Sequence, residues 1–402
     1  MAATLIFAAT YLVLAIGRFP GLRIDRAGAA IVGATLMVAA GVLRFDEALR
    51  AVDWTTIVLL LGMMIVVANL HLSGFFRLVA ARVVCHAHSP KMLLAGIIAV
   101  SGVLSALFVN DTMCIVLTPL VAQVTLSLRR NPVPYLLAVA LASNAGSVAT
   151  ITGNPQNMMI GALSGIPYPR FAAALSPVAA VSLVLAWLVL VAVYREEFAS
   201  GRFEKIDPGR IRVNRPMLWK ALAVSAGMVF FFFRGWPVAQ TAIVAGAVLL
   251  VTRRVKPEKV YHDIDWPLLA MFAGLFIVVR GFETTALERG LLDFAGGTPL
   301  DRPLVLSFFS AAASNLVSNV PAVLLFKPLI VRLADPVLSW LTLAMSSTLA
   351  GNFTLVGSVA NLIVVERARP EVRIRFVDHF KVGGPVTALS IAAGALWLDW
   401  LR

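Results

Sequence analysis

Apolar runs of about the length needed to cross a bilayer recur along the whole chain, and short polar stretches interrupt them. Phe171 to Val193 and Met217 to Phe233 are two such runs, and a helix needs roughly 17 to 25 apolar residues to cross the hydrocarbon core. The pattern predicts an all-α, polytopic membrane protein. The first run, Ala2 to Gly17, lacks a basic region before it and is followed by arginines, so we expect a retained span and not a signal peptide.

One polar interruption falls inside a run that is long enough to cross. The stretch TITGNPQNMMIG, Thr150 to Gly161, places Gly, Asn and Pro in the middle of apolar sequence. Gly and Asn weaken a helix, Pro breaks it, and an unpaired amide in hydrocarbon costs several kcal/mol. We therefore expect a broken helix whose polar groups are buried by protein or line a watery cavity.

The chain also repeats itself. Three segments of the first half resemble three of the second, in the same order and at offsets of 212, 209 and 204 residues: VDWTTIVLLLGMMIVV (Val52–Val67) and IDWPLLAMFAGLFIVV (Ile264–Val279), NDTMCIVLTPLV (Asn110–Val121) and NVPAVLLFKPLI (Asn319–Ile330), SNAGSVATITGNPQN (Ser143–Asn157) and STLAGNFTLVGSVAN (Ser347–Asn361). This order predicts two repeats, residues 1–194 and 217–402, joined by a basic linker at 195–216.

Charge predicts the orientation of the repeats. The net charge is +13, but most Lys and Arg lie in loops between apolar runs, which is the positive-inside pattern and not a nucleic-acid surface. If the basic region from Arg195 to Lys220 is cytoplasmic, it and five further loops on the same side hold 24 of the 34 Lys and Arg residues. Asp53 then begins its span outside and its repeat mate Asp265 begins inside. The repeats are therefore expected to be inverted.

This orientation requires two regions that enter and leave on one side, at about 92–128 and 302–334. Their apolar arms surround the polar tips NDT and SNVP. The short arms favour re-entrant hairpins over two complete spans, although charge alone does not separate these alternatives. With broken helices at about 134–160 and 338–365, we expect five spans and one hairpin per half, about 10 spans and 2 hairpins in all.

These motifs resemble the ion transporter superfamily, which includes arsenite permeases, sodium/proton antiporters of the NhaD type and divalent-anion/sodium symporters. SNVP, Ser318 to Pro321, is similar to the second hairpin tip of that family, and VNDT, Val109 to Thr112, is similar to the first with Val for Ser and an inserted Asp. GNPQN and GSVAN are similar to its two unwound loops. The resemblance covers almost the whole chain, but its motifs are short and do not fix a substrate.

The resemblance implies a solute site between the tips and the unwound loops. The residues that it places there for substrate binding are Asn110, Thr112, Gly153, Asn154, Asn157, Ser318, Asn319, Gly357, Ser358 and Asn361. Half-helix N-termini in such transporters face anions, and freed carbonyls hold cations. We expect the two glycines to let the backbone open.

Three residues are candidates for ion coupling: Asp111, Asn144 and Lys327. Asp111 is an acid at expected midplane depth, which is costly unless it is paired, protonated or bound to a cation; the alternative is a capping acid at a turn. Lys327 either extends its amine to the outer surface, or supplies positive charge to an anion path or pairs with an acid. A sodium ion at Asn110, Asp111 and Asn319 is a further hypothesis.

The favoured function is an ion-gradient-driven secondary transporter that moves a small anion or oxyanion-type solute, such as arsenite, an inorganic anion or a carboxylate. The alternative is a sodium/proton antiporter that uses Asp111. No Walker motif or nucleophile–base arrangement is present, so we expect neither an enzyme nor a cofactor beyond a coupling sodium or proton. The family suggests a homodimer, and we expect a multi-pass protein of the bacterial inner membrane. We expect all five histidines to be solvated and both cysteines to be buried thiols.

Overall fold

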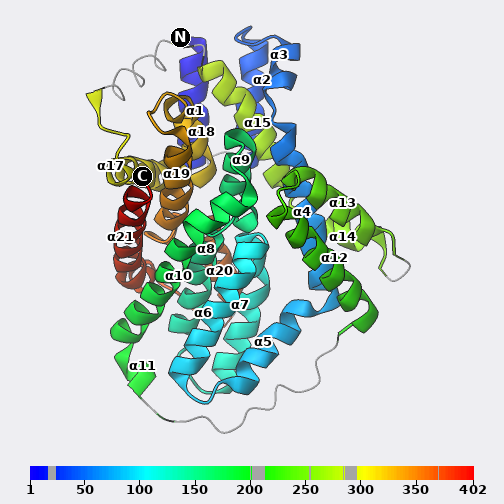
Figure 1. The fold of residues 1–402 in the computed structure, drawn as a ribbon, viewed down its shortest axis with the longest axis vertical. Coiled ribbons are helices and arrows are strands. Elements are labelled where there is room, and N and C mark those ends of the chain that lie inside the picture. Colours follow the sequence, from blue (N-terminus) through cyan, green and yellow to red (C-terminus); the bar gives the residue numbers. More distant parts are fainter. Residues whose placement is uncertain are drawn as a thin grey trace.

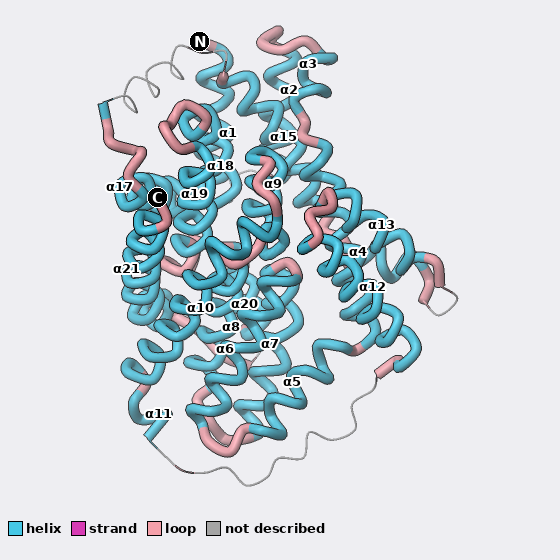
Figure 2. The backbone as a smooth tube through the Cα atoms, in the orientation of Figure 1, coloured by secondary structure: helices cyan, strands magenta, loops and turns pink. Residues whose placement is uncertain are grey.

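The computed structural model describes residues 1–16, 24–199, 201, 213–252, 255–283, 285, 297–369 and 371–402. All regular structure in these residues is helical, as Figure 2 shows. The all-α prediction is thus confirmed for the described part of the chain. Most of the expected basic linker, residues 200 and 202–212, lies outside it.

The described helices are divided between the two halves of the chain. The first half contains α1 (Ala2–Ile16), α2 (Arg26–Ala39), α3 (Phe45–Ala51), α4 (Trp54–Ser73), α5 (Phe75–His86), α6 (Pro90–Leu107), α7 (Asn110–Ser127), α8 (Pro132–Ser147), η1 (Ile151–Gly153), α9 (Pro155–Ser164), α10 (Tyr168–Val193) and α11 (Arg195–Ala199). The second half contains α12 (Arg215–Phe233), α13 (Val238–Leu250), α14 (Pro257–His262), α15 (Trp266–Phe282), α17 (Pro303–Val317), α18 (Asn319–Ile330), α19 (Pro336–Ala350), α20 (Val359–Ala368) and α21 (Phe376–Trp400).

Five described helices, α4, α6, α10, α12 and α21, are long and apolar enough to cross a membrane. Seven more are apolar but have only 10 to 17 residues: α1, α2, α13, α15, α17, α18 and α19. Helices of that length fall short of the hydrocarbon thickness unless they are paired end to end or surrounded by protein. The described helices are therefore those of a membrane protein, and seven of the apolar ones are too short to cross the hydrocarbon core alone.

Side chains fix where equivalent helices begin. Asp53 caps α4 by accepting a hydrogen bond from the Thr56 amide at 2.8 Å, and Asp265 caps α15 through the Leu268 amide at 2.9 Å. Asn131 and Asp335 cap α8 and α19 in the same way. A side-chain oxygen at this position satisfies an amide that the helix leaves unpaired.

One set of helices, the outer group, consists of α1–α4 and α12–α15. Here α4 packs against α13 and α15 packs against α2. A Cβ on Gly62 would lie 2.6 Å from the Ala242 backbone, and a Cβ on Gly274 would lie 2.7 Å from the Ala30 backbone. Small residues thus bring each pair of helices into backbone contact, which provides the packing energy available inside a bilayer.

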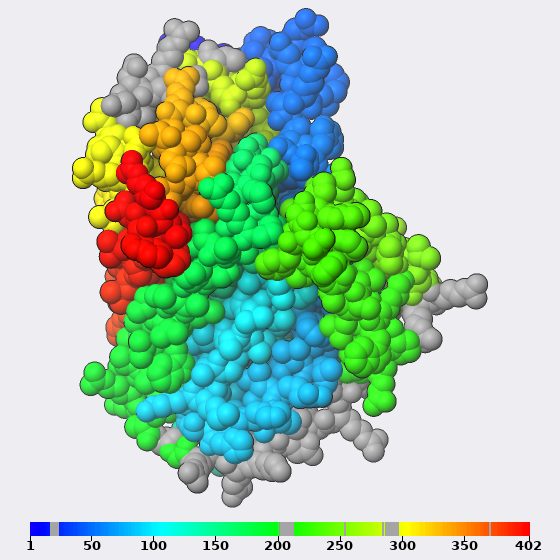
Figure 3. All heavy atoms as spheres, in the orientation of Figure 1, coloured from blue at the N-terminus to red at the C-terminus, as the bar shows by residue number. Residues whose placement is uncertain are grey.

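The remaining long helices, α6–α10 and α17–α21, form the central bundle. In Figure 1 the pair α6 and α7 lies in the lower part of the molecule, and α17 and α18 lie in the upper part. The red C-terminal helix α21 packs against the green α10 on the face shown in Figure 3. The two halves of the chain therefore share one bundle.

Four junctions interrupt the bundle helices. α6 and α7 are separated by Phe108 and Val109, and α17 and α18 meet at Ser318. α8 ends at Ser147 and α9 begins at Pro155, while α19 ends at Ala350 and α20 begins at Val359. The starts of α7, α9, α18 and α20 carry most of the residues that the sequence singled out.

Candidate functional site

Asn144 lies near the end of α8, before one of these junctions, and forms hydrogen bonds with residues at two others. Its Oδ1 accepts hydrogen bonds from Asn110 Nδ2 at 3.0 Å and from Ser358 Oγ at 3.2 Å. Its Nδ2 donates to Asn352 Oδ1 at 2.9 Å and to Asn361 Oδ1 at 3.2 Å. One buried amide on α8 thus contacts the start of α7 and the break between α19 and α20, so residues from both halves meet here.

Thr348 on α19 plays the corresponding part for the other break. Its Oγ1 accepts hydrogen bonds from Asn154 Nδ2 at 3.1 Å and Gln156 Nε2 at 3.2 Å, and it donates to Asn157 Oδ1 at 3.4 Å. Thr348 stands 204 residues after Asn144, the offset that also relates the two breaks in the sequence. Each break is therefore held by a side chain from the helix that precedes the other break.

Asn157 and Asn361 close the breaks themselves. Asn157 Nδ2 donates to the carbonyls of Ser147 and Thr150, each at 3.0 Å. Asn361 Nδ2 donates to the carbonyls of Gly351 at 2.7 Å and Thr354 at 3.0 Å. Backbone carbonyls freed by an interrupted helix need partners when they are buried, and one asparagine per break supplies them.

The first residues of α7 and α18 differ from these satisfied groups. Asn110 and Asn319 are 3% and 8% exposed, and the Oδ1 atom of each is buried without a hydrogen-bond partner among the described residues. Neither helix has a side-chain cap, whereas Asn154 caps α9 and Ser358 caps α20. A buried, unpaired carbonyl oxygen costs about 1–3 kcal/mol, so both positions are prepared to contact something else.

Backbone constraints accompany two of the junctions. Ser318 has φ +76° and ψ +158°, a region that residues with a side chain rarely occupy and that costs about 1–3 kcal/mol. Gly153 has no positive φ; a Cβ at that position would lie 2.1 Å from the Ser147 carbonyl oxygen. We expected Gly153 to provide conformational freedom, but it is required because two backbone segments approach closely.

The other predicted residues surround the cluster less directly. Gly357 donates its amide to the Thr354 carbonyl at 3.0 Å. Thr112 and Asp111 are half-buried, and among the described residues neither side chain forms a hydrogen bond or an ion pair. Lys327 lies elsewhere, with its Nζ 3.3 Å from Glu283 Oε1. Of the two sequence interpretations of Lys327, the geometry agrees with pairing to an acid.

Several contributors were not singled out from the sequence. Gln156 and Ser147 bond to members of the cluster, and their positions inside and just before the broken segment were the only signal. His379 was expected to be solvated, and this was wrong. It is 1% exposed, and its Nε2 lies 3.0 Å from the Asn352 carbonyl, because α21 already begins at Phe376 and carries it into the bundle. Cys85, expected to be buried, is half-buried.

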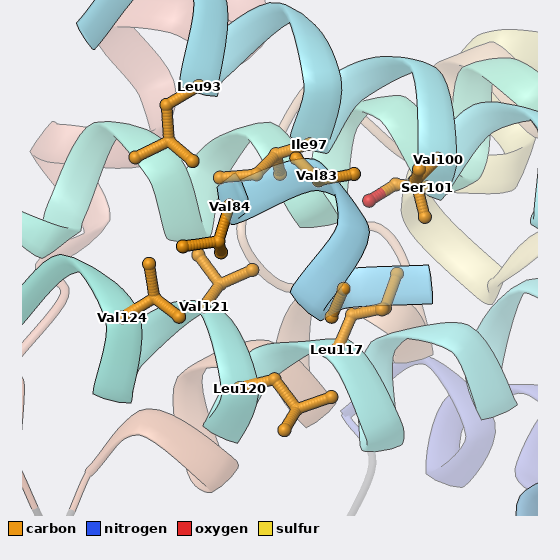
Figure 4. Close-up of a pocket in the computed structure, with 11 residues that line it drawn as sticks. Val83, Val84, Leu93, Ile97, Val100, Ser101, Leu117, Leu120, Val121 and Val124 are labelled. Carbon is orange, nitrogen blue, oxygen red and sulfur yellow. The ribbon is translucent and has the colours of Figure 1, made fainter. Parts of the chain in front are cut away.

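An apolar cavity between α5, α6 and α7 offers a contrast. Figure 4 shows Val, Leu and Ile side chains of the three helices converging on it, with Ser101 as the one polar side chain. A solute that carries charge or hydroxyl groups needs convergent polar partners, and this cavity lacks them. The polar cluster around Asn144 is the candidate site.

Known proteins resemble this chain in sequence and in fold. Residues 11–350 match the family model described as citrate transporter (CitMHS). The chain belongs to the citrate transporter family. Members of the family are membrane transporters, so the expectation that the protein is a transporter and not an enzyme is confirmed.

Relatives with different names align over nearly the full length. The silicon efflux transporter LSI3 of rice (Oryza sativa subsp. japonica) is 29% identical over 93% of this chain and 92% of its own. A 46 kDa membrane protein of Mycobacterium leprae is 28% identical over 99% and 97%. A putative transporter named arsB in Dictyostelium discoideum is 24% identical over 93% and 87%.

Two solved transporter structures share the fold. The YdaH transporter of Alcanivorax borkumensis superposes with a TM-score of 0.59 at 16% identity, covering 100% of this chain and 98% of its own. MtrF of Neisseria gonorrhoeae, described as an antimetabolite efflux pump, also gives 0.59, at 13% identity and covering 99% and 93%. At these identities the similarity supports the fold and not the solute.

Proposed function

We propose that the protein is an ion-gradient-driven secondary transporter that moves a small anion or oxyanion-type solute by alternating access. The solute binds where α7, α9, α18 and α20 begin, at the residues predicted from the sequence. The observation that carries this proposal is the pair of buried, unpartnered Oδ1 atoms of Asn110 and Asn319 at two uncapped helix N-termini.

The chemistry of the cluster favours such a solute. Uncapped helix N-termini present free amides and a partial positive charge, which attract anionic oxygens. The unpartnered carbonyl oxygens suit a hydroxyl donor or a coupling cation such as sodium. A solute with both hydroxyl groups and oxygens, such as an oxyacid or a carboxylic acid, uses both kinds of partner. The family is described by citrate and the rice relative by silicon, and both citrate and silicic acid are solutes of this kind.

Alternating access in this proposal follows from two inverted repeats, each with five spans and one hairpin formed by α6–α7 or α17–α18. The hydrogen bonds of Asn144 and Thr348, related by 204 residues, support the duplication. The reciprocal packing of α4 on α13 and α2 on α15 supports it independently. The central bundle then moves against the outer group. A homodimer in a bacterial inner membrane, formed through the outer group, completes the proposal.

Thermal unfolding of the purified protein with added solutes tests the site. Arsenite, silicic acid, sulfate, citrate and sodium are screened, because a ligand at 100 times its Kd stabilises the folded state by about 2.7 kcal/mol. We expect the stabilising solute to lose its effect in Asn110→Ala and Asn319→Ala. The control is Asn69→Ala, because Asn69 is buried but bonds only within its own helix. Equal stabilisation of all three variants would contradict the assignment.

A sodium/proton antiporter is the second candidate, and Asp111 favours it. The carboxylate lies in the first turn of α7, next to Asn110, and it forms no hydrogen bond or ion pair with the described residues. An unpaired acid at membrane depth can hold a cation or a proton. Loss of sodium-dependent proton flux in Asp111→Asn proteoliposomes favours the antiporter. Surviving anion exchange without a pH gradient favours an anion carrier in which Asp111 couples the ion.

A further inference from the structure

A polar cavity of about 410 Å³ lies between α3, α15 and α18. Its lining includes three basic side chains, Arg50, Arg280 and Lys327, and two acidic ones, Glu47 and Glu283. It shares no lining residue with the cluster around Asn144. We call this cavity the vestibule; the proposed orientation of the repeats places it on the outer side.

Glu283 holds two of the cations at once. Its Oε1 lies 3.3 Å from Lys327 Nζ, and its Oε2 lies 2.9 Å from Arg280 Nη1. Glu283 is 15% exposed and Lys327 37% exposed, so both charges are partly withdrawn from solvent. One carboxylate neutralises one of the two cations, and the group keeps a net positive charge.

The other two charges of the vestibule are on α3. The Arg50 side chain is exposed and forms no ion pair or hydrogen bond with a described residue. Glu47 already accepts a hydrogen bond from the Arg44 amide at 2.9 Å as part of the helix cap. The vestibule is therefore lined by one guanidinium without an ion pair among the described residues and by a carboxylate that two cations share, and its net charge is +1.

The ion pair also bridges two bodies of the fold. Glu283 follows α15 in the outer group, and Lys327 belongs to α18 in the central bundle. In the described part of the chain it is the one ion pair that connects these two groups. The repeat mates, His71 and Thr118, are not paired with each other: His71 pairs with Asp263.

We propose that the vestibule is a second binding site, in which an oxyanion binds between Arg50 and Lys327 and replaces Glu283 as the partner of the lysine. This inference rests on the proposed function for one point, that the solute is an anion. About 410 Å³ holds a small oxyanion together with waters, each of which takes about 30 Å³. Anion binding then weakens the ion-pair contact between α15 and α18, so that a bound anion loosens the outer group from the central bundle.

Calorimetric titration of the purified, full-length protein with sulfate, at ionic strength matched with chloride, tests the site. Arg50→Gln should weaken sulfate binding about tenfold, the effect of one charge on a doubly charged anion at roughly 6 Å where the dielectric is close to that of water, because Arg50 is exposed. Arg44→Gln is the matched control, since it removes the same charge from the start of the same helix and Arg44 pairs only with Asp46 among described residues. Equal binding by the two variants overturns the proposal, as does the absence of sulfate binding by the wild type.

Glu283→Gln separates a binding site from a purely structural ion pair. A binding site predicts sulfate affinity several-fold higher in this variant, because the competing carboxylate is gone and two cations are free. A structural ion pair predicts no gain. Arg50→Gln keeps the test valid if Glu283→Gln folds poorly.

The Asn319→Ala protein distinguishes the vestibule from the central site. Sulfate binding that persists there, and still depends on Arg50, supports the vestibule. Sulfate binding lost in Asn319→Ala but unaffected by Arg50→Gln overturns it and leaves the proposed function intact. The opposite result would refute only the proposed function: sulfate binds in the vestibule, but Asn110→Ala and Asn319→Ala leave the binding of every transported solute unchanged.

Discussion

Replacing Asn144 by alanine should destabilise the protein more than any other single asparagine replacement in the bundle. The side chain makes four hydrogen bonds of 2.9 to 3.2 Å, and it is 1% exposed. Each bond contributes about 0.5–1.5 kcal/mol net, and partners left unpaired in a buried site cost more. The expected loss in the free energy of unfolding is about 3–5 kcal/mol.

Asn69→Ala is the matched control for this loss. Asn69 is 2% exposed, and its side chain donates one hydrogen bond to the Ile65 carbonyl at 2.8 Å, within α4. The two variants remove the same atoms from equally buried positions, so the cavities that they leave are similar. The difference between their losses in unfolding free energy therefore measures the bonds of Asn144 to other helices. We expect Asn69→Ala to cost about 1 kcal/mol.

Denaturant titration in mixed micelles, followed by circular dichroism, measures both variants. If Asn144→Ala and Asn69→Ala lose the same stability, the bonds of Asn144 do not hold the halves together and the cluster is not a structural hub. A double replacement with Asn110→Ala adds a second check. The two losses should be less than additive, because both variants remove the bond between these side chains.

Three further predictions follow from backbone and interhelical contacts. Gly153→Ala should destabilise the protein by about 3 kcal/mol, because its Cβ would collide with the Ser147 carbonyl. Gly227→Ala, where the space is open, is the control and should change the stability by no more than about 1 kcal/mol. Similar thermal stability of the two variants would refute the steric argument. Ser318→Gly should stabilise by about 1 kcal/mol in denaturant titration, since glycine accepts φ +76°; an unchanged midpoint would show that the strain is absent. Tyr11→Phe should cost about 1 kcal/mol by the same titration, because it removes a 3.0 Å hydrogen bond from α1 to an α18 carbonyl; no loss would mean that the hydroxyl is equally well paired with water.

The sequence predicted much of the helical framework because local signals determine it. Asp53 and Asp265 begin their helices as caps, and the Pro and Gly positions of GNPQN end one helix and start another. Apolar length and charge distribution indicated a polytopic membrane protein, and the family match agrees. These features depend on neighbouring residues and on hydrocarbon thickness, so a single sequence contains them.

The contacts of the site could not be predicted in the same way. The sequence identified Asn144 as a candidate but contained no information on its partners Asn352 and Asn361, which lie 208 and 217 residues later. The same holds for Lys327, whose acid partner depends on how α15 packs against α18. The prediction that His379 is solvated was wrong because the residue lies within a basic stretch near a helix start, and only tertiary packing shows that it is buried. Long-range pairing is decided by the fold, which local patterns do not encode.

The bond between Asn154 and Thr348 sets a condition on biosynthesis, because the two residues are 194 positions apart. A ribosome that adds roughly 5–20 residues per second needs about 10–40 s to travel from one to the other. Until then the first interrupted helix is in the membrane without its hydroxyl partner. A nascent chain stalled in this interval should therefore be a better substrate for membrane quality-control proteases than the finished protein.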